Sequence, residues 1–191
     1  MSISKIALDL DEVLVPLLRP MAKWRGVQMP HGKHPYLYRE VFQCTEEQSQ
    51  EILHKFYRSK DFLYLKPIPG AQRAMQILKN TPDLDKLYVV TGRQDVVRET
   101  TELWVERYFP GVFDDVILTN SFTEHEVKKA DLCRSLGVGL IIDDSYQTCD
   151  ECRDVGIDAV NFIGFDDEIY PWCEESDISL MDWKNFTPTQ N

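Results

Sequence analysis

Short apolar segments recur along the 191-residue chain, and segments with helical periodicity lie between them. The apolar segments cover residues 5–10, 86–90, 115–118, 139–142 and 159–162. The helical segments cover residues 70–78, 95–108, 126–136 and 145–155. Strands that alternate with helices of this length pair in parallel through right-handed crossovers. The pattern therefore predicts an α/β fold whose core is a doubly wound parallel sheet.

Residues 17–66 break this alternation, because they carry helical patterns at 17–24, 36–42 and 46–57 but no strand pattern. Thr45 is a suitable N-cap for the last of these helices, and acidic residues follow it in the first turn. We therefore expect a small helical cap at residues 17–66, inserted after the first strand, and a core formed by residues 1–16 and 67–191. From residue 166 onward the periodicity is weak, which predicts loops and a final short strand or turn.

Charge limits the partners of this chain. It has 32 acidic and 21 basic side chains, a formal net charge of -11 at pH 7. A surface with this balance repels the phosphate backbone of DNA and RNA, so we expect no polymeric nucleic acid partner. A small phosphate ester can still bind, because a bound cation and a few local donors act strongly at short range.

The cysteines and the N-terminal residues bear on the compartment. Five cysteines are scattered through predicted core elements, which favours free thiols in a reducing, cytoplasmic environment. The first residues lack a basic region followed by a long apolar run, so we expect no secretory signal. No segment is apolar over the length that a membrane span requires, and we expect no membrane contact. The sequence does not indicate the oligomeric state.

Residues with catalytic potential stand at the ends of three of the predicted strands or begin a predicted helix. Ligands of an open parallel sheet bind beyond the carboxyl ends of its strands, where these residues are expected to meet. They are Asp9 and Asp11 at the end of the first strand, Thr91, Gly92 and Arg93 at the end of the second, Asp143 and Asp144 at the end of a later one, and Lys128 and Lys129 at the start of a helix.

These residues stand in the segments LDLDEV, VVTGR and IIDD and in a helix led by lysine. The ordered set resembles the four signature motifs of phosphatases of the haloacid dehalogenase superfamily. The helical insert, the segments PIPGAQRAMQIL and TTELWVERYFPGVFDDVILT, and Tyr170-Pro171-Trp172 are similar to the 5′(3′)-deoxyribonucleotidase type. The chain departs from that type at Arg93 and Cys173, and both departures bear on the substrate more than on the chemistry.

Phosphoryl transfer needs an in-line nucleophile, a proton for the leaving group and neutralisation of the phosphoryl oxygens. Asp9 can supply the nucleophilic carboxylate, which gives an aspartyl-phosphate intermediate. Asp11 lies two residues on and can act as the general acid for the leaving group, then as the base for water. We expect the Thr91 hydroxyl, the Gly92 N–H and Lys129 to bind the phosphate, with Lys128 as the alternative lysine.

The resemblance also implies a Mg²⁺ ion. Its ligands would be the carboxylate of Asp9, the backbone carbonyl of Asp11 and the carboxylate of Asp144, with Asp143 supporting Asp144. Hard oxygen ligands suit this cation. The sequence leaves open which of Asp143 and Asp144 binds the cation directly and which one supports it.

We therefore expect a magnesium-dependent phosphatase that acts on a small phosphate monoester. A nucleoside or deoxynucleoside monophosphate is the first substrate hypothesis, and a sugar phosphate or another metabolite phosphate is the alternative. A non-catalytic binding or scaffold protein that keeps the same fold is the second alternative.

Three further features allow more than one interpretation. Arg93 either binds substrate or pairs with an acid such as Asp95 or Glu99 near a helix start. The pair Cys149 and Cys152 lies within a helical segment without a second pair, so buried core thiols are expected rather than a redox or zinc site. The aromatic residues of the insert are expected to form its own core more than to contact a nucleobase. These are Trp24, Tyr36, Tyr38 and Phe42.

Overall fold

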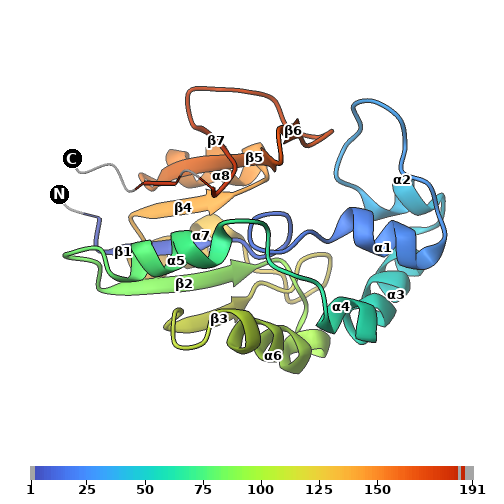
Figure 1. Ribbon diagram of the computed structural model, residues 1–191, viewed down its shortest axis with the longest axis horizontal. Coiled ribbons are helices and arrows are strands. Elements are labelled where there is room, and N and C mark those ends of the chain that lie inside the picture. Colours follow the sequence, from blue (N-terminus) through green and yellow to red (C-terminus); the bar gives the residue numbers. More distant parts are fainter. Residues whose placement is uncertain (1–2, 185, 188–191) are drawn as a thin grey trace.

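The computed structural model describes residues 3–184, 186 and 187. Its centre is a mixed, mostly parallel sheet with the strand order β3-β2-β1-β4-β5-β6, to which β7 adds by pairing with β5 (Figure 1). β6 runs antiparallel to β5, and the other pairings are parallel. The strands are β1 (Lys5–Leu8), β2 (Lys86–Thr91), β3 (Asp115–Leu118), β4 (Leu140–Asp143), β5 (Asp158–Phe165), β6 (Glu168–Ile169) and β7 (Ser179–Met181).

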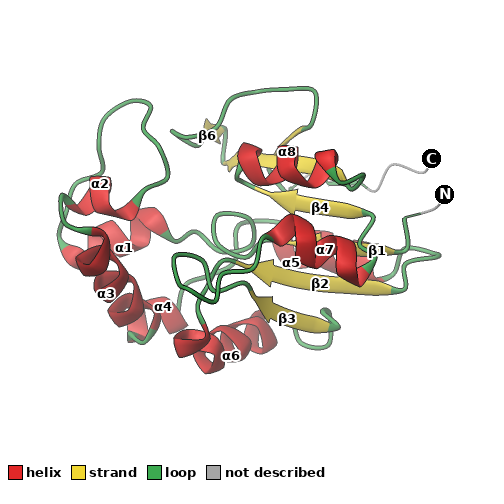
Figure 2. Ribbon diagram, turned by 180° about the vertical axis from the view of Figure 1, so that it is seen from behind, coloured by secondary structure: helices red, strands yellow, loops and turns green. Residues whose placement is uncertain are grey.

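Helices cover both faces of the sheet, which confirms the doubly wound arrangement. On β1, Ile6 and Leu8 belong to the apolar cluster that includes buried residues of α5 (Ala71–Lys79) and α6 (Arg98–Tyr108). The intervening Ala7 belongs to a second cluster with α7 (Lys129–Leu136) and α8 (Tyr146–Asp154). Because successive side chains of a strand point to opposite faces, this alternation places the two helix pairs on opposite sides. Figure 2 shows α7 and α8 in front of the sheet.

Element boundaries differ from the sequence-based expectation at several places. β1 ends at Leu8 rather than at residue 10, because the Leu10 carbonyl accepts the N–H groups of Leu14 and Val15 and closes a turn. α7 begins at Lys129 rather than at residue 126, and the 3-10 helix Asp95–Val97 precedes α6. β5 extends to Phe165, where the short strands of the predicted C-terminal region pair with it.

Residues 17–66 are helical, as the periodicity predicts. They contain α1 (Leu18–Arg25), α2 (Tyr38–Phe42), α3 (Glu46–Tyr57) and α4 (Lys60–Leu63), and no strand is assigned in this fully described stretch. Thr45 caps α3 in a reciprocal pair of hydrogen bonds with Gln48, at 3.2 and 3.1 Å. Figure 1 shows these helices beyond the carboxyl ends of the strands. The proposed domain boundaries at residues 16/17 and 66/67 stay a prediction.

The chain enters this helical group through a tight turn after β1. Glu12 has a left-handed backbone, with φ of 63°, and its side chain is buried. Its Oε1 accepts the N–H groups of Leu17 and Leu18 at 3.0 and 2.6 Å, which satisfies free donors at the start of α1. Burial raises the pKa of Glu12 to about 7 despite these hydrogen bonds. The turn therefore anchors the first helix of the insert directly beside the end of β1.

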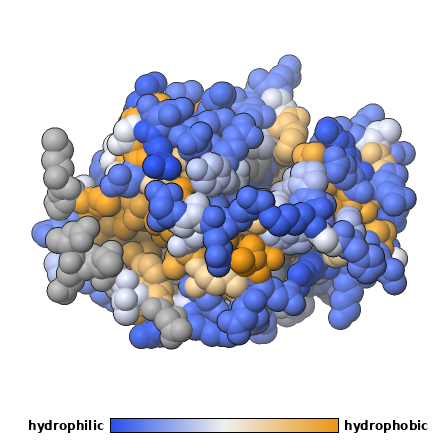
Figure 3. Space-filling model, turned by 90° about the horizontal axis from the view of Figure 1, so that it is seen from above, coloured by the Kyte–Doolittle hydropathy of each residue, from blue (hydrophilic) through white to orange (hydrophobic). Residues whose placement is uncertain are grey.

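Polar residues cover most of the face seen in Figure 3, and hydrophobic residues appear between them only in patches. This surface fits the high content of charged residues, 28% of the chain. Within the part of the chain that the structure describes, no helix combines the length and the apolar character of a membrane span.

Candidate active site

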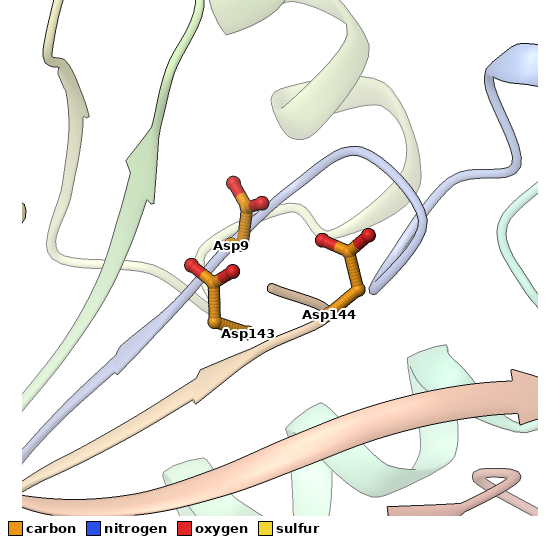
Figure 4. A group of neighbouring side chains, drawn as sticks. All are labelled: Asp9, Asp143 and Asp144. Carbon is orange, nitrogen blue, oxygen red and sulfur yellow. The ribbon is translucent and has the colours of Figure 1, made fainter. Parts of the chain in front are cut away.

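Three carboxylates meet where two neighbouring parallel strands end. β1 pairs with β4 in the register Leu8↔Ile142, and the Asp9 N–H donates to the Ile142 carbonyl at 2.9 Å. Asp9 therefore lies beside Asp143 and Asp144. Ligand oxygens of the three residues lie within 4.8 Å of one another (Figure 4). The convergence of strand ends expected from the sequence is present in the structure.

Lys129 closes this cluster from the start of α7. Its Nζ lies 3.0 Å from Asp9 Oδ1 and 2.7 Å from Asp143 Oδ2. Burial alone would lower the pKa of Lys129, but the carboxylates of Asp143 and Asp9 outweigh burial and hold this pKa well above its usual range. The neighbouring Lys128 is exposed and is not among the residues that line this site. Of the two candidate lysines, Lys129 is the one that the structure brings to the acids.

The acids repel one another in a site with little solvent. Burial raises the pKa of Asp9 to about 7, with Asp143 and Asp11 adding to the rise and Lys129 opposing it. Burial also raises the pKa of Asp144 well above its usual range, and the charges of Asp143 and Asp9 add to it. One lysine thus does not balance three crowded carboxyl groups. A divalent cation bound between them would relieve this repulsion.

The hydrogen bonds of the cluster leave specific oxygens free. Asp143 is fully occupied, because Oδ1 accepts the Ser145 N–H at 2.9 Å and Oδ2 accepts from Lys129. Asp144 Oδ2 accepts from Trp172 Nε1 at 2.8 Å. Among the described residues, Asp144 Oδ1 and Asp9 Oδ2 have no hydrogen-bond donor. These two oxygens are therefore open to a ligand.

β2, the neighbour of β1 on its other side, ends at Thr91, and Gly92 follows it. Both residues line the same cavity as the acids. A Cβ at position 92 would lie 2.9 Å from Ser121 Oγ, so the close approach of Ser121 favours glycine here. The Thr91 hydroxyl accepts the Arg93 N–H at 3.4 Å. The position suits phosphate binding by both residues, and that role stays a prediction.

Arg93 pairs with an acid, as one of the two interpretations expects, but the acid is Asp11 and not Asp95 or Glu99. Its Nε and Nη2 donate to Asp11 Oδ2 and Oδ1 at 3.0 and 2.6 Å. Asp95 pairs instead with Arg98 at 2.6 Å. The physical reason is burial. The Arg93 side chain is completely buried beside the mostly buried Asp11, whereas the Asp95 side chain is exposed.

The insert completes this ion pair. Tyr57 of α3 donates its hydroxyl to Asp11 Oδ2 at 2.7 Å. The guanidinium carbon of Arg93 lies 4.3 Å from the ring centroid of Tyr57 and 4.6 Å from that of Phe62, distances typical of cation–π contacts. Arg93 Nη1 donates to the Thr101 hydroxyl at 3.0 Å. With these partners Arg93 is not free to bind substrate, and Asp11 is held outside the cluster of three acids.

A cavity of about 520 Å³ lies over the acids, between the helical insert and the sheet. The aromatic residues of the insert divide between two roles. Trp24 packs on Phe56, with ring centroids 5.4 Å apart, and belongs to the core. Tyr36 and Tyr38 line the cavity, and Tyr36 packs edge-on against Trp172 at 4.6 Å. Core packing therefore accounts for only part of this aromatic set.

Several site residues escaped the sequence reasoning. The acids also accept hydrogen bonds from Tyr57, Ser145 and Trp172. No motif or spacing in the sequence indicates that these three residues belong to the site. Trp172 belongs to the segment that resembles the deoxyribonucleotidase type, which was the one available signal. The expectation for Cys149 and Cys152 is confirmed, since both are fully buried and not in a disulfide. Burial raises the pKa of Cys152 to about 11, which makes it a poor nucleophile.

No family model matches the sequence, and no curated protein does. Solved structures share its fold. CbbY from Rhodobacter sphaeroides, in complex with xylulose-1,5-bisphosphate, is 13% identical with a TM-score of 0.58 over 94% of each chain. A HAD family hydrolase from Deinococcus radiodurans, with bound phosphate and sodium, is 15% identical with a TM-score of 0.54, over 88% of this chain and 84% of that one.

L-2-haloacid dehalogenase from Xanthobacter autotrophicus is 13% identical with a TM-score of 0.54, over 85% of this chain and 78% of that one. The chain therefore has the haloacid dehalogenase (HAD) fold, as the motifs predict. Identities this low show the fold alone. Because a hydrolase with bound phosphate and a dehalogenase share this fold, the chemistry of this chain has to be argued from its site.

Proposed function

We propose that this protein is a magnesium-dependent phosphatase that hydrolyses a small phosphate monoester through an aspartyl-phosphate on Asp9. One observation carries the proposal. Carboxylates from the ends of two adjacent parallel strands, Asp9 on one and Asp143 with Asp144 on the other, converge on the partly buried Lys129. This arrangement supplies a nucleophile, a cation site and a positive charge for phosphoryl oxygens within a few ångströms.

The donor set fits Mg²⁺, which prefers carboxylate and carbonyl oxygens. Asp9 and Asp144 each keep one carboxylate oxygen free of protein donors, whereas both oxygens of Asp143 are occupied. We therefore assign Asp9, Asp144 and the backbone carbonyl of Asp11 as ligands, with Asp143 holding Lys129 in place. When bound, the cation would neutralise charge on the phosphoryl oxygens and on the acids.

The protein groups would act in two steps. The Asp9 carboxylate attacks phosphorus, the ester P–O bond breaks, and the leaving alkoxide takes a proton from Asp11. Asp11 then removes a proton from water, whose oxygen attacks phosphorus and releases Asp9 and inorganic phosphate. Thr91, the Gly92 N–H and Lys129 would hold the phosphoryl oxygens throughout.

The environment of Asp11 matches one of these steps better than the other. Two guanidinium donors and the Tyr57 hydroxyl surround its carboxylate, an arrangement suited to the ionised base of the second step. For the first step Asp11 must carry a proton and turn an oxygen toward the leaving group. Asp11 Oδ2 would therefore leave Tyr57 and carry the proton, while Oδ1 keeps its hydrogen bond from Arg93.

For the substrate we propose a nucleoside or deoxynucleoside monophosphate. Aromatic side chains at the cavity support it, because Tyr36, Tyr38 and Trp172 offer faces and edges to a base. The amide side chains of Gln50, Gln94 and Gln147 at the same cavity would equally suit the hydroxyl groups of a sugar phosphate, which is the second candidate. A non-catalytic scaffold would not require the complete set of Asp9, Asp11, Lys129 and the acidic pair.

Hydrolysis of p-nitrophenyl phosphate tests the proposal. We expect turnover with Mg²⁺, loss of turnover with EDTA, and loss in Asp9→Asn, which keeps the shape of the side chain but removes the nucleophile. A panel of nucleoside and sugar monophosphates, followed by phosphate release, then separates the two substrate classes. Absence of turnover across the panel would favour the scaffold.

A further inference from the structure

We propose that the cavity selects esters whose phosphoryl group is their only anionic group, so that the leaving group carries no negative charge. The proposal rests on the phosphatase function proposed above and narrows its substrate class. It follows from the charged side chains that line the cavity and from the ion pairs and hydrogen bonds that these side chains already make within the protein.

Acids outnumber cations around the cavity. Its lining contains five carboxylates against two permanently charged cations. The acids are Asp9, Asp11, Glu46, Asp143 and Asp144, and the cations are Arg93 and Lys129. A phosphate dianion with a magnesium ion adds no net charge, so the loaded site stays negative. The cavity therefore offers no net positive charge that would attract a second anionic group of the substrate.

Both cations are fully engaged at the phosphate end. Lys129 bridges Asp9 and Asp143, and the side chain of Arg93 is buried against Asp11, with no exposed surface. Neither can move to a distant carboxylate or phosphate without leaving a buried acid unpaired, which is costly. Lys129 is therefore available to the phosphoryl group and to its acids, and Arg93 only to Asp11, and neither cation is available to the leaving group.

The remaining wall is polar but uncharged at its centre. Gln94 Nε2 donates to Gln50 Oε1 at 3.1 Å and to the Ser121 carbonyl at 2.9 Å, which identifies its Oε1 as an acceptor. His54 Nε2 therefore donates to that oxygen, at 2.7 Å. A neutral ring satisfies this bond with its second nitrogen as an acceptor. The network joins α3 to the segment after β2 through side-chain amides and an imidazole.

The acid at this wall, Glu46, is also occupied. Gln50 Nε2 donates to its Oε1 at 2.8 Å, and Arg39 lies 3.4 Å from its Oε2. Aromatic residues also line the cavity, with Tyr36 and Tyr38 joined through their hydroxyls at 3.1 Å. Burial raises the pKa of both tyrosines well above its usual range, so these hydroxyls stay neutral. Hydroxyls, amides and ring faces suit neutral polar groups and supply no formal positive charge to balance a second anion.

A matched pair of esters tests this. We would measure kcat/KM of the full-length, Mg²⁺-loaded protein at pH 8, where free imidazole is neutral, with phenyl phosphate and 4-carboxyphenyl phosphate. Their leaving phenols have similar acidity, so the carboxylate is the main difference. We expect kcat/KM to be at least about tenfold lower for the carboxylated ester.

A charge variant tests the cause. Gln50→Lys places a cation at the uncharged wall and should narrow the ratio of the two kcat/KM values at least about threefold. Gln50→Met is the matched control, because it removes the amide without adding charge, and it should leave the ratio as in the wild type. An unchanged ratio in Gln50→Lys would contradict the electrostatic cause.

The outcomes separate this inference from the proposed function. Equal or faster hydrolysis of the carboxylated ester by the wild type would overturn the inference alone. If neither ester releases phosphate, the result would overturn the phosphatase proposal on which this inference rests.

Discussion

The guanidinium of Arg93 donates two hydrogen bonds to the carboxylate of Asp11, at 2.6 and 3.0 Å, and its side chain is completely buried. The two residues come from the ends of adjacent strands, and Tyr57 of the helical insert adds a third donor. The proposed acid and base of the reaction is thus held by the sheet and by the insert together. Movement of the insert would change the hydrogen bonding of Asp11 directly.

Removing the Arg93 side chain should destabilise the protein. Arg93→Met leaves the mostly buried Asp11 without its ion-pair partner, which costs about 3 kcal/mol in comparable buried pairs. Arg93→Lys keeps the charge but loses the two-pronged geometry, and should cost less. Urea denaturation of the three proteins measures the free energies of unfolding. Equal stability of wild type and Arg93→Met would show that the pair adds nothing to the fold.

Loss of the Tyr57 hydroxyl should affect the reaction more than the fold. Tyr57→Phe keeps the ring that packs against Arg93 and Phe62 but removes the donor to Asp11. We expect kcat to change about tenfold, because the orientation of Asp11 depends on this bond, with about 1 kcal/mol lost in stability. Steady-state kinetics with Mg²⁺ and thermal unfolding measure the two effects. Tyr64→Phe, at an exposed tyrosine, is the control and should change neither.

Asp144→Asn should weaken Mg²⁺ binding and stabilise the metal-free protein. Binding loses a charged ligand, so we expect the Kd from calorimetry to rise at least about tenfold. Without metal, Asp144 is a buried acid crowded by Asp143 and Asp9, which raises its pKa, so its ionised form opposes folding at neutral pH. The Tm in EDTA should therefore rise. Asp150→Asn, at an exposed position of α8, is the control, and a lower Tm in Asp144→Asn would contradict the repulsion argument.

Asp114 should contribute stability that depends on pH. Burial tends to raise its pKa, but hydrogen bonds from Lys79, the Leu87 N–H and Lys86 outweigh burial and lower this pKa to about 2. An acid whose pKa is lowered by folding stabilises the protein above the ordinary value of about 4, and this contribution is lost as the pH falls through about 2.

The measurement for Asp114 is urea denaturation of wild type and Asp114→Asn at pH 7 and at pH 3. We expect the variant to be less stable by about 1 kcal/mol at pH 7, because the ion pairs are partly exposed, and the difference to shrink at pH 3. Asp177→Asn, at an exposed aspartate, should show no such pH dependence. A difference that stays constant between the two pH values would rule out titration of Asp114 as its source.

Much of the site was accessible from the chain itself. Alternating apolar and helical segments predict a parallel sheet, and all strands of such a sheet end at the same edge. Residues that directly follow a strand are thereby placed in space by their position in the sequence. For this reason the sequence predicts that Asp9, Asp143 and Asp144 lie together with Lys129, and in the structure they do.

Only the tertiary structure decided how the remaining groups are paired. Asp11 lies beyond the end of β1, where a turn and not the strand alternation sets the direction of its side chain. Its partners Arg93 and Tyr57 stand 82 and 46 residues away, and Trp172 stands 28 residues from Asp144. Strand periodicity determines the face and the edge at which a residue lies. Contacts between loops and inserted helices depend on how these elements pack, and no local pattern in the sequence records that.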